Sequence, residues 1–128
     1  MDSVSIKEVA LQFILAASRN IYPNEFMGLL RMEGDVITEV LVLPQSIWGE
    51  SFASISSAHI PIDNTIVGSV HSHPSPNNRP SETDLVEFGR SGAIHMIAGY
   101  PYRGMGDIAC YDHSGNKVGI EVVYETGD

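Results

Sequence analysis

Two histidines and an aspartate are spaced so that they can bind one metal ion. His71 ends the apolar run 65–71 and His73 follows two residues later, and side chains two apart on a strand point to the same face. Zinc accepts imidazole nitrogen and carboxylate oxygen in a tetrahedral site, and a catalytic zinc keeps one position open for water. The third ligand we predict is Asp84, because the proline-containing residues 74–80 turn the chain back and present it from the first turn of a helix.

A hydrolytic metal site also needs a proton acceptor and a hydrogen-bond donor. Glu25 is the candidate general acid/base, since it immediately precedes a strand that we expect beside the histidine strand. Ser81, three residues before Asp84, has a hydroxyl that can donate to a developing oxyanion. Ordinary interpretations stay open for both: Ser81 is also a good helix N-cap, and Glu25 is also a solvated carboxylate at the end of a strand.

The composition excludes several kinds of partner. The chain has 128 residues and a formal charge of -9, from 16 acidic and 7 basic residues. Nucleic-acid binding depends on lysine and arginine neutralising phosphates, so we expect no nucleic-acid partner. No apolar run approaches the ~18 residues of a membrane span, and no signal-peptide pattern opens the sequence. Cys110 is the single cysteine, which indicates a reducing compartment, and we expect a cytoplasmic protein without a membrane partner.

Hydrophobic periodicity predicts the elements that must hold these residues. Three- and four-residue spacing predicts a helix capped by Ser5 and Glu8. Its expected buried face comprises Ile6, Val9, Ala10, Phe13, Ile14 and Ala17. A β-hairpin is expected over 26–32 and 36–43. Further strands are expected at 65–71, 93–99, 108–112 and 117–125, and a second helix at 81–89. This order predicts a single α/β domain over residues 1–128, with helices packed on a mixed sheet.

The complete motif resembles that of a known family. His71-x-His73, seven residues, Ser81, two residues and Asp84 match the motif of the JAMM (MPN-plus) zinc metalloproteases, and Glu25 before a Gly-Leu-Leu run is similar to the family's glutamate segment. The resemblance covers most of the chain. It implies a curved mixed β-sheet flanked by helices, related to the cytidine deaminases. It also implies one zinc per chain on the two histidines and the aspartate, with the glutamate as acid/base and the serine assisting the tetrahedral intermediate.

The resemblance also implies a reaction and a substrate class. A small stand-alone prokaryotic member is expected to be a zinc-dependent isopeptidase or peptidase, like a deubiquitinase, that hydrolyses the amide bond after the C-terminal tail of a ubiquitin-like protein. A processing peptidase for a sulfur-carrier protein precursor is the alternative, and a non-catalytic MPN scaffold is a further one. A zinc deaminase is excluded, because it needs a His-x-Glu followed by a Pro-Cys-x-x-Cys motif. A homo-oligomer stays open.

Other residues that bind metals or substrates fit no recognised site. His95, Cys110 and His113 have spacings that resemble no known metal site, so we predict no second metal. Cys110 lies in an apolar stretch and is expected to be a small buried hydrophobic residue. Trp48 and Phe52 fall in the weakly patterned residues 45–60, where either core packing or contact with a substrate fits them.

Overall fold

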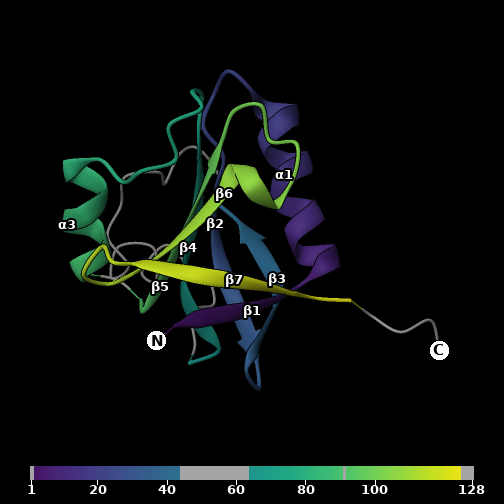
Figure 1. Cartoon of the computed structure of the whole chain (residues 1–128), viewed down its shortest axis with the longest axis vertical. Coiled ribbons are helices and arrows are strands. Elements are labelled where there is room, and N and C mark those ends of the chain that lie inside the picture. Colours follow the sequence, from purple (N-terminus) through teal and green to yellow (C-terminus); the bar gives the residue numbers. More distant parts are fainter. Residues whose placement is uncertain (1, 44–63, 91, 125–128) are drawn as a thin grey trace.

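The structure, a computed structural model, describes residues 2–43, 64–90 and 92–124 (Figure 1). Its strands are β1 (Ser3–Lys7), β2 (Met27–Glu33), β3 (Val36–Val42), β4 (Ile66–His73), β5 (Ile94–Gly99), β6 (Ile108–Asp112) and β7 (Lys117–Val123). Its helices are α1 (Glu8–Ile21), α3 (Glu82–Arg90) and the 3-10 turn η2 (Met105–Asp107). The predicted hairpins, central strands and second helix are confirmed. In the described part of the chain, no helix has both the length and the apolar character needed to cross a membrane.

The strands form one mixed sheet that closes on itself. Their order is β1-β3-β2-β4-β5-β6-β7, and β7 pairs with β1. The pairs β1–β3, β1–β7 and β4–β5 are parallel, and the remaining pairs are antiparallel. The mixed sheet is as expected, whereas its closure was not expected. Closure depends on β1, which joins β3 to β7 and so removes the two edges that an open sheet would expose.

The first element was predicted wrongly. Residues Ser3–Lys7 form a strand, and the helix begins only at Glu8, after an N-cap, Lys7, whose side chain makes no capping hydrogen bond. The predicted capping box of Ser5 and Glu8 does not form, because the backbone of Ser5 is paired in the sheet with β7 and β3. Val4 and Ile6 are both buried, and this alternation is the period-two pattern of a strand.

The buried face of α1 also differs from the prediction. The helix buries Ala10, Leu11, Ile14, Leu15 and Ser18. Val9 and Phe13, both predicted to be core residues, are 63% and 43% exposed. Ile6 belongs to the strand, so it does not mark the buried face of the helix. The face that meets the sheet includes Leu11 and Leu15 instead.

The helices flank the sheet, and the predicted metal ligands lie at the end of β4 and at the start of α3. Figure 1 shows α1 and α3 on opposite sides of the strands, with the 74–80 segment leading from the end of β4 to α3. The hydrophobic core lies between α1 and the sheet, and includes Ile14, Leu15 and Val70. Residues 45–60, including Trp48 and Phe52, lie outside the described residues, and so does their predicted role.

Candidate metal centre

His71 and His73 project from the end of a strand that is paired on both sides. In β4, His71 is opposite Met27 of β2 and Ile97 of β5, and His73 is opposite Gly99. A side chain at Gly99 would bring its Cβ to 3.1 Å from the carbonyl oxygen of a proline in the 74–80 segment. Glycine therefore lets that segment lie close against β5. Pairing on both sides fixes the backbone at His71, and pairing with β5 fixes it at His73.

Asp84 is held by the N-terminal cap of α3. The Asp84 amide donates to Ser81 Oγ at 3.0 Å, and the Ser81 amide donates to Asp84 Oδ2 at 2.9 Å. This reciprocal pair is a capping box with aspartate in the place of the usual glutamate. The cap satisfies two backbone donors at the start of the helix and at the same time fixes the direction of the carboxylate.

The three predicted ligands converge with distances that suit zinc. His71 Nε2 lies 3.2 Å from His73 Nε2, and each of these nitrogens lies 3.3 Å from a carboxylate oxygen of Asp84. Zinc bonds of ~2.0 Å in tetrahedral geometry require ligand atoms about 3.3 Å apart. Within the described residues, these three form the one group of histidine, cysteine or acidic side chains able to hold a metal ion. The donor set and its spacing therefore fit zinc.

The tautomer of His73 also suits a metal ligand. Its Nδ1 lies 2.8 Å from the carbonyl oxygen of Asn77, and a carbonyl can only accept, so Nδ1 carries the hydrogen. In the neutral ring, the lone pair is then on Nε2, which is the nitrogen that faces His71 and Asp84. A hydrogen bond of this kind, made by the outer ring nitrogen, is what orients metal-binding histidines.

Electrostatics in the group favour a cation. The hydrogen bond to Asp84 raises the pKa of His73, and this outweighs the opposing effect of burial. Burial alone would raise the pKa of Asp84, but hydrogen bonds from His71 and His73 hold it far below its usual range. The carboxylate is therefore ionised, and positive charge between it and the imidazoles, whether a proton or a metal ion, is stabilised.

Glu25 is positioned by its neighbour Phe26, which is fixed to the histidine strand. The Phe26 amide donates to Ser72 Oγ at 2.8 Å, and the Ser72 amide donates to the Phe26 carbonyl at 2.9 Å. Glu25 itself is exposed. After the larger effect of Asp84, the Glu25 carboxylate also contributes to the raised pKa of His73. The predicted base therefore lies within electrostatic reach of the ligands but outside the ligand group.

The residues predicted to have no part in metal binding lie elsewhere. His95 is buried, with Nδ1 2.8 Å from Ser69 Oγ and Nε2 3.3 Å from the carbonyl oxygen of Gly92. His113 is exposed. Cys110 is buried as predicted, and burial raises the pKa of its thiol to about 12, so the thiol stays protonated. Such a thiol is neither a nucleophile nor a zinc ligand at neutral pH.

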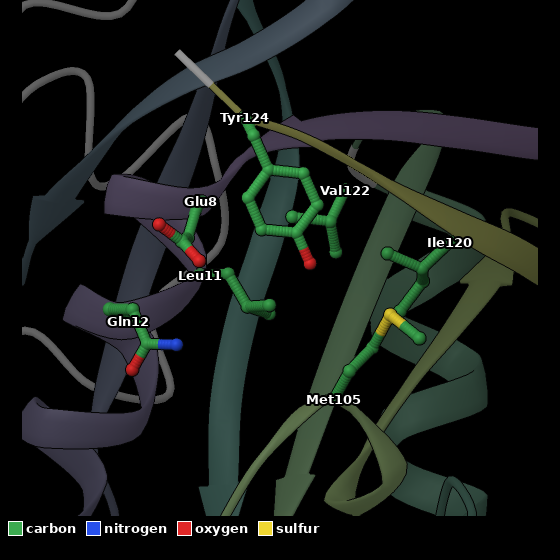
Figure 2. A pocket seen from close by; sticks show the side chains of 7 residues that line it. All are labelled: Glu8, Leu11, Gln12, Met105, Ile120, Val122 and Tyr124. Atoms are coloured by element: carbon green, nitrogen blue, oxygen red, sulfur yellow. The ribbon is translucent and has the colours of Figure 1, made fainter. Parts of the chain in front are cut away.

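A cavity of about 310 Å³ lies apart from this group (Figure 2). The side chains in Figure 2 come from α1, the η2 turn, β7 and the residue that follows β7. They comprise Glu8, Leu11, Gln12, Met105, Ile120, Val122 and Tyr124. Among the described lining residues there is one carboxylate, Glu8, and no histidine or cysteine.

Sequence reasoning missed the polar residues that hold the ligands in place. Ser72 lies between the two histidines, so the period of a strand points its side chain to the opposite face, where a hydroxyl needs a buried partner. That signal was available in the sequence. Tyr102 was not recognisable in this way, because its contact with His73 joins residues 29 apart in the sequence.

Comparisons with known proteins agree with the geometry. The family described as prokaryotic homologs of the JAB domain matches residues 7–111. A probable metalloprotease of Haloferax volcanii is 41% identical over 132 residues, which covers 95% of this chain and 81% of that protein.

Solved structures are similar over nearly the whole chain. A JAB1/MPN domain protein from Archaeoglobus fulgidus has a TM-score of 0.76 and 38% identity, covering 94% of this chain and 99% of that one. A structure described as JAMM, a metalloprotease-like zinc site in the proteasome and signalosome, has a TM-score of 0.72 and 35% identity, covering 96% and 99%. A protein from Desulfitobacterium hafniense, with a TM-score of 0.64 and 22% identity over 97% and 95%, shares the fold.

Proposed function

The chain belongs to the family of prokaryotic homologues of the JAB domain, as a small JAMM-type zinc metallopeptidase. On this premise, we propose that its substrate is the C-terminal tail of a ubiquitin-like protein. The observation that carries the proposal is the convergence of His71, His73 and Asp84 at spacings of 3.2 to 3.3 Å, with the Glu25 carboxylate within electrostatic reach of His73. This set of groups is suited to the hydrolysis of an amide by water, and no side-chain nucleophile is needed.

In the reaction we propose, His71, His73 and Asp84 would hold a zinc ion. That ion would supply a Lewis acid, which makes the attacking water more acidic and polarises the scissile carbonyl. Glu25 accepts the proton that the attacking water releases and passes it to the departing amine nitrogen. Its exposed carboxylate is free to make both transfers, because it is not among the groups that converge on the ion.

Ser81 supplies a hydrogen-bond donor. Its Oγ accepts the amide of Asp84 at 3.0 Å, so the hydroxyl hydrogen can be directed toward the substrate. Ser81 is exposed and directly precedes α3. The hydroxyl is thus available to stabilise the negative charge that develops on the carbonyl oxygen.

The surroundings of the metal group favour a polypeptide tail over a small enclosed molecule. Glu25, Ser81 and the first part of the 74–80 segment are exposed, so the described part of the site is accessible from solvent. Small molecules are usually bound in cavities that cover most of their surface. An extended tail can instead lie across an open site, with its recognition distributed along its length.

The test is a panel of substrates given to the zinc-loaded protein and analysed by mass spectrometry. The panel contains linear fusions and isopeptide-linked conjugates of ubiquitin-like proteins, a sulfur-carrier precursor, and an unrelated extended peptide. We expect cleavage after the tail of a ubiquitin-like protein, its loss on chelation, and its return when zinc is added. Glu25→Gln serves as the inactive control.

Other outcomes would point to other functions. Cleavage restricted to the sulfur-carrier precursor would identify a processing peptidase with the same chemistry. Cleavage of only the unrelated peptide would refute the substrate class and leave the metallopeptidase activity in place. A protein that binds zinc and cleaves nothing in the panel would support a scaffold.

A further inference from the structure

A buried tyrosine in the turn after β5 donates a hydrogen bond to the backbone of a proposed metal ligand. Tyr102 is 1% exposed, and its hydroxyl donates to the carbonyl oxygen of His73 at 2.7 Å. Burial raises the pKa of the Tyr102 phenol, and a hydrogen bond from the Ser72 side chain partly opposes this shift. The phenolic oxygen thus contacts two consecutive residues of the strand that carries both histidine ligands.

The position of Tyr102 is fixed from several directions. Its main-chain carbonyl accepts a hydrogen bond from the guanidinium of Arg19 at 2.5 Å, and its amide donates to the carbonyl of Gly99 at 3.0 Å. The ring makes edge contacts with the rings of Tyr22 and Tyr100, with centroids 6.2 and 5.9 Å away. In Figure 1, the turn after β5 passes beside the C-terminal end of α1, which is where Arg19 lies.

Tyr102 also has an unusual backbone conformation. Its φ is 58°, the one positive φ of a non-glycine residue among those described. A bulky residue rarely adopts this left-handed region, and such a conformation persists only when the surrounding structure imposes it. Here the turn directs the ring inward beneath His73, so the conformation is the one that brings the hydroxyl to the ligand backbone.

A second tyrosine offers a matched comparison. Tyr111 is also buried, and its hydroxyl donates to the carbonyl oxygen of Asn78 at 2.9 Å. Asn78 lies in the same 74–80 segment but binds no metal in our assignment. The two tyrosines therefore make the same kind of hydrogen bond, one to a ligand residue and one to a residue between the ligands.

We propose that Tyr102 is a positioning residue, whose hydroxyl fixes the backbone of His73 and so sets the direction of its ligand nitrogen before a metal ion binds. The inference rests on the metal site assigned above and adds a residue outside the motif. Removal of a group that hydrogen-bonds to a metal ligand typically weakens metal binding by about 10- to 100-fold.

The test compares Tyr102→Phe with Tyr111→Phe, because each substitution removes one hydroxyl and keeps the ring. Zinc affinity is measured by competition with a chelator, and the visible spectrum of the cobalt-substituted protein reports the ligand geometry. We expect Tyr102→Phe to weaken zinc binding about tenfold and to change the cobalt spectrum. Tyr111→Phe should keep the parent's affinity and spectrum, even if it melts at a lower temperature. In the cleavage assay, Tyr102→Phe should lower kcat with little change in KM.

Two results would overturn the proposal: a parent-like zinc affinity and cobalt spectrum in Tyr102→Phe, or the same loss in both variants. If Tyr102→Phe does not fold, Arg19→Gln replaces it, since Arg19 is exposed and acts on Tyr102 from the surface. That variant should lose zinc affinity in the same direction, and unchanged affinity would count against the proposal. Metal binding is measured independently of cleavage, so failure of the substrate panel leaves this test intact.

Discussion

The main chain of Phe26 and the residue between the two histidines, Ser72, exchange two hydrogen bonds, of 2.8 and 2.9 Å. Ser72 is fully buried, and Phe26 directly follows Glu25. The exchange therefore couples the segment that carries the proposed base to the strand that carries two proposed ligands. We expect this contact to set the distance between the base and the metal ligands. A shift of about 1 Å in the position of a catalytic group can lower the rate about a hundredfold.

Ser72→Ala should consequently lower kcat by about tenfold or more, because the Phe26 amide loses its acceptor and Glu25 is no longer held in place. The matched control is Ser69→Ala on the same strand, which removes the hydroxyl next to His95, away from the metal group. Both variants should be less stable than the parent, by about 1 to 3 kcal/mol. Steady-state kinetics and thermal unfolding distinguish them. Equal losses of kcat in the two variants would show that general destabilisation is the cause.

Glu25→Gln should keep the zinc and the fold while losing most of its turnover. An amide cannot accept the proton of the attacking water, and removal of a general base typically costs about 100- to 10,000-fold in rate. Glu82→Gln is the control, since Glu82 is an exposed carboxylate in the first turn of α3 and should stay fully active. Zinc content and kcat are measured for both. A Glu25→Gln variant with parent-like turnover would exclude Glu25 as the base.

Ser81→Ala separates the two roles of this hydroxyl. Loss of the cap on Asp84 should cost about 1 kcal/mol of stability. Loss of an oxyanion donor should lower kcat by about a hundredfold or more. Thermal unfolding reports the first effect and single-turnover cleavage reports the second. A variant that melts slightly earlier and keeps full kcat would leave Ser81 as a helix cap alone.

Asp84→Asn should reduce zinc binding from one ion per chain to well below one. The amide keeps the shape of the side chain but removes the charge that the two imidazoles face. Asp112→Asn is the matched control, because the Asp112 carboxylate also accepts backbone amides, from Ser114 and Asn116, in a turn away from the metal group. Metal analysis of the purified proteins gives the stoichiometry. Full zinc content in Asp84→Asn would refute its assignment as a ligand.

The sequence predicted the convergence of His71, His73 and Asp84 better than it predicted the start of the fold, and the reason is physical. His71, His73, Ser81 and Asp84 lie within one strand, loop and helix, where spacing alone determines which side chains meet. Residues Ser3–Lys7 are different, because whether they form a strand depends on pairing with β7, more than a hundred residues later. A local pattern of apolar residues cannot report such a partner, so the helix period was extended through a strand.

The contacts that hold the site together were the hardest to predict. Ser72 meets Phe26 across 46 residues, and Tyr102 meets His73 across 29. Each is a polar group that becomes buried only when the sheet forms, and burial without a partner would be costly. Composition and periodicity describe which residues enter the core, whereas these pairings depend on the register of β2, β4 and β5.

Zinc and protons should compete for the same group, which predicts opposite pH dependence for the metal-free and zinc-loaded proteins. In the metal-free protein, the hydrogen bond to Asp84 raises the pKa of His73 above 6.5. The charged pair therefore stabilises the fold below pH 6.5, and this stability is lost as the pH rises through the raised pKa. Asp84 stays ionised throughout, because its pKa is held below 3.8.

The melting temperature of the metal-free protein should thus fall by a few degrees between about pH 6 and about pH 8, for a contribution on the order of 1 kcal/mol. With excess zinc it should rise over the same range, because zinc needs the neutral imidazole and proton competition weakens as the pH increases. Asp84→Asn measured in parallel removes the pair, so subtracting its pH dependence cancels titrations elsewhere in the chain. If the parent and this variant show the same pH dependence without metal, the proton on His73 is not the species that zinc displaces.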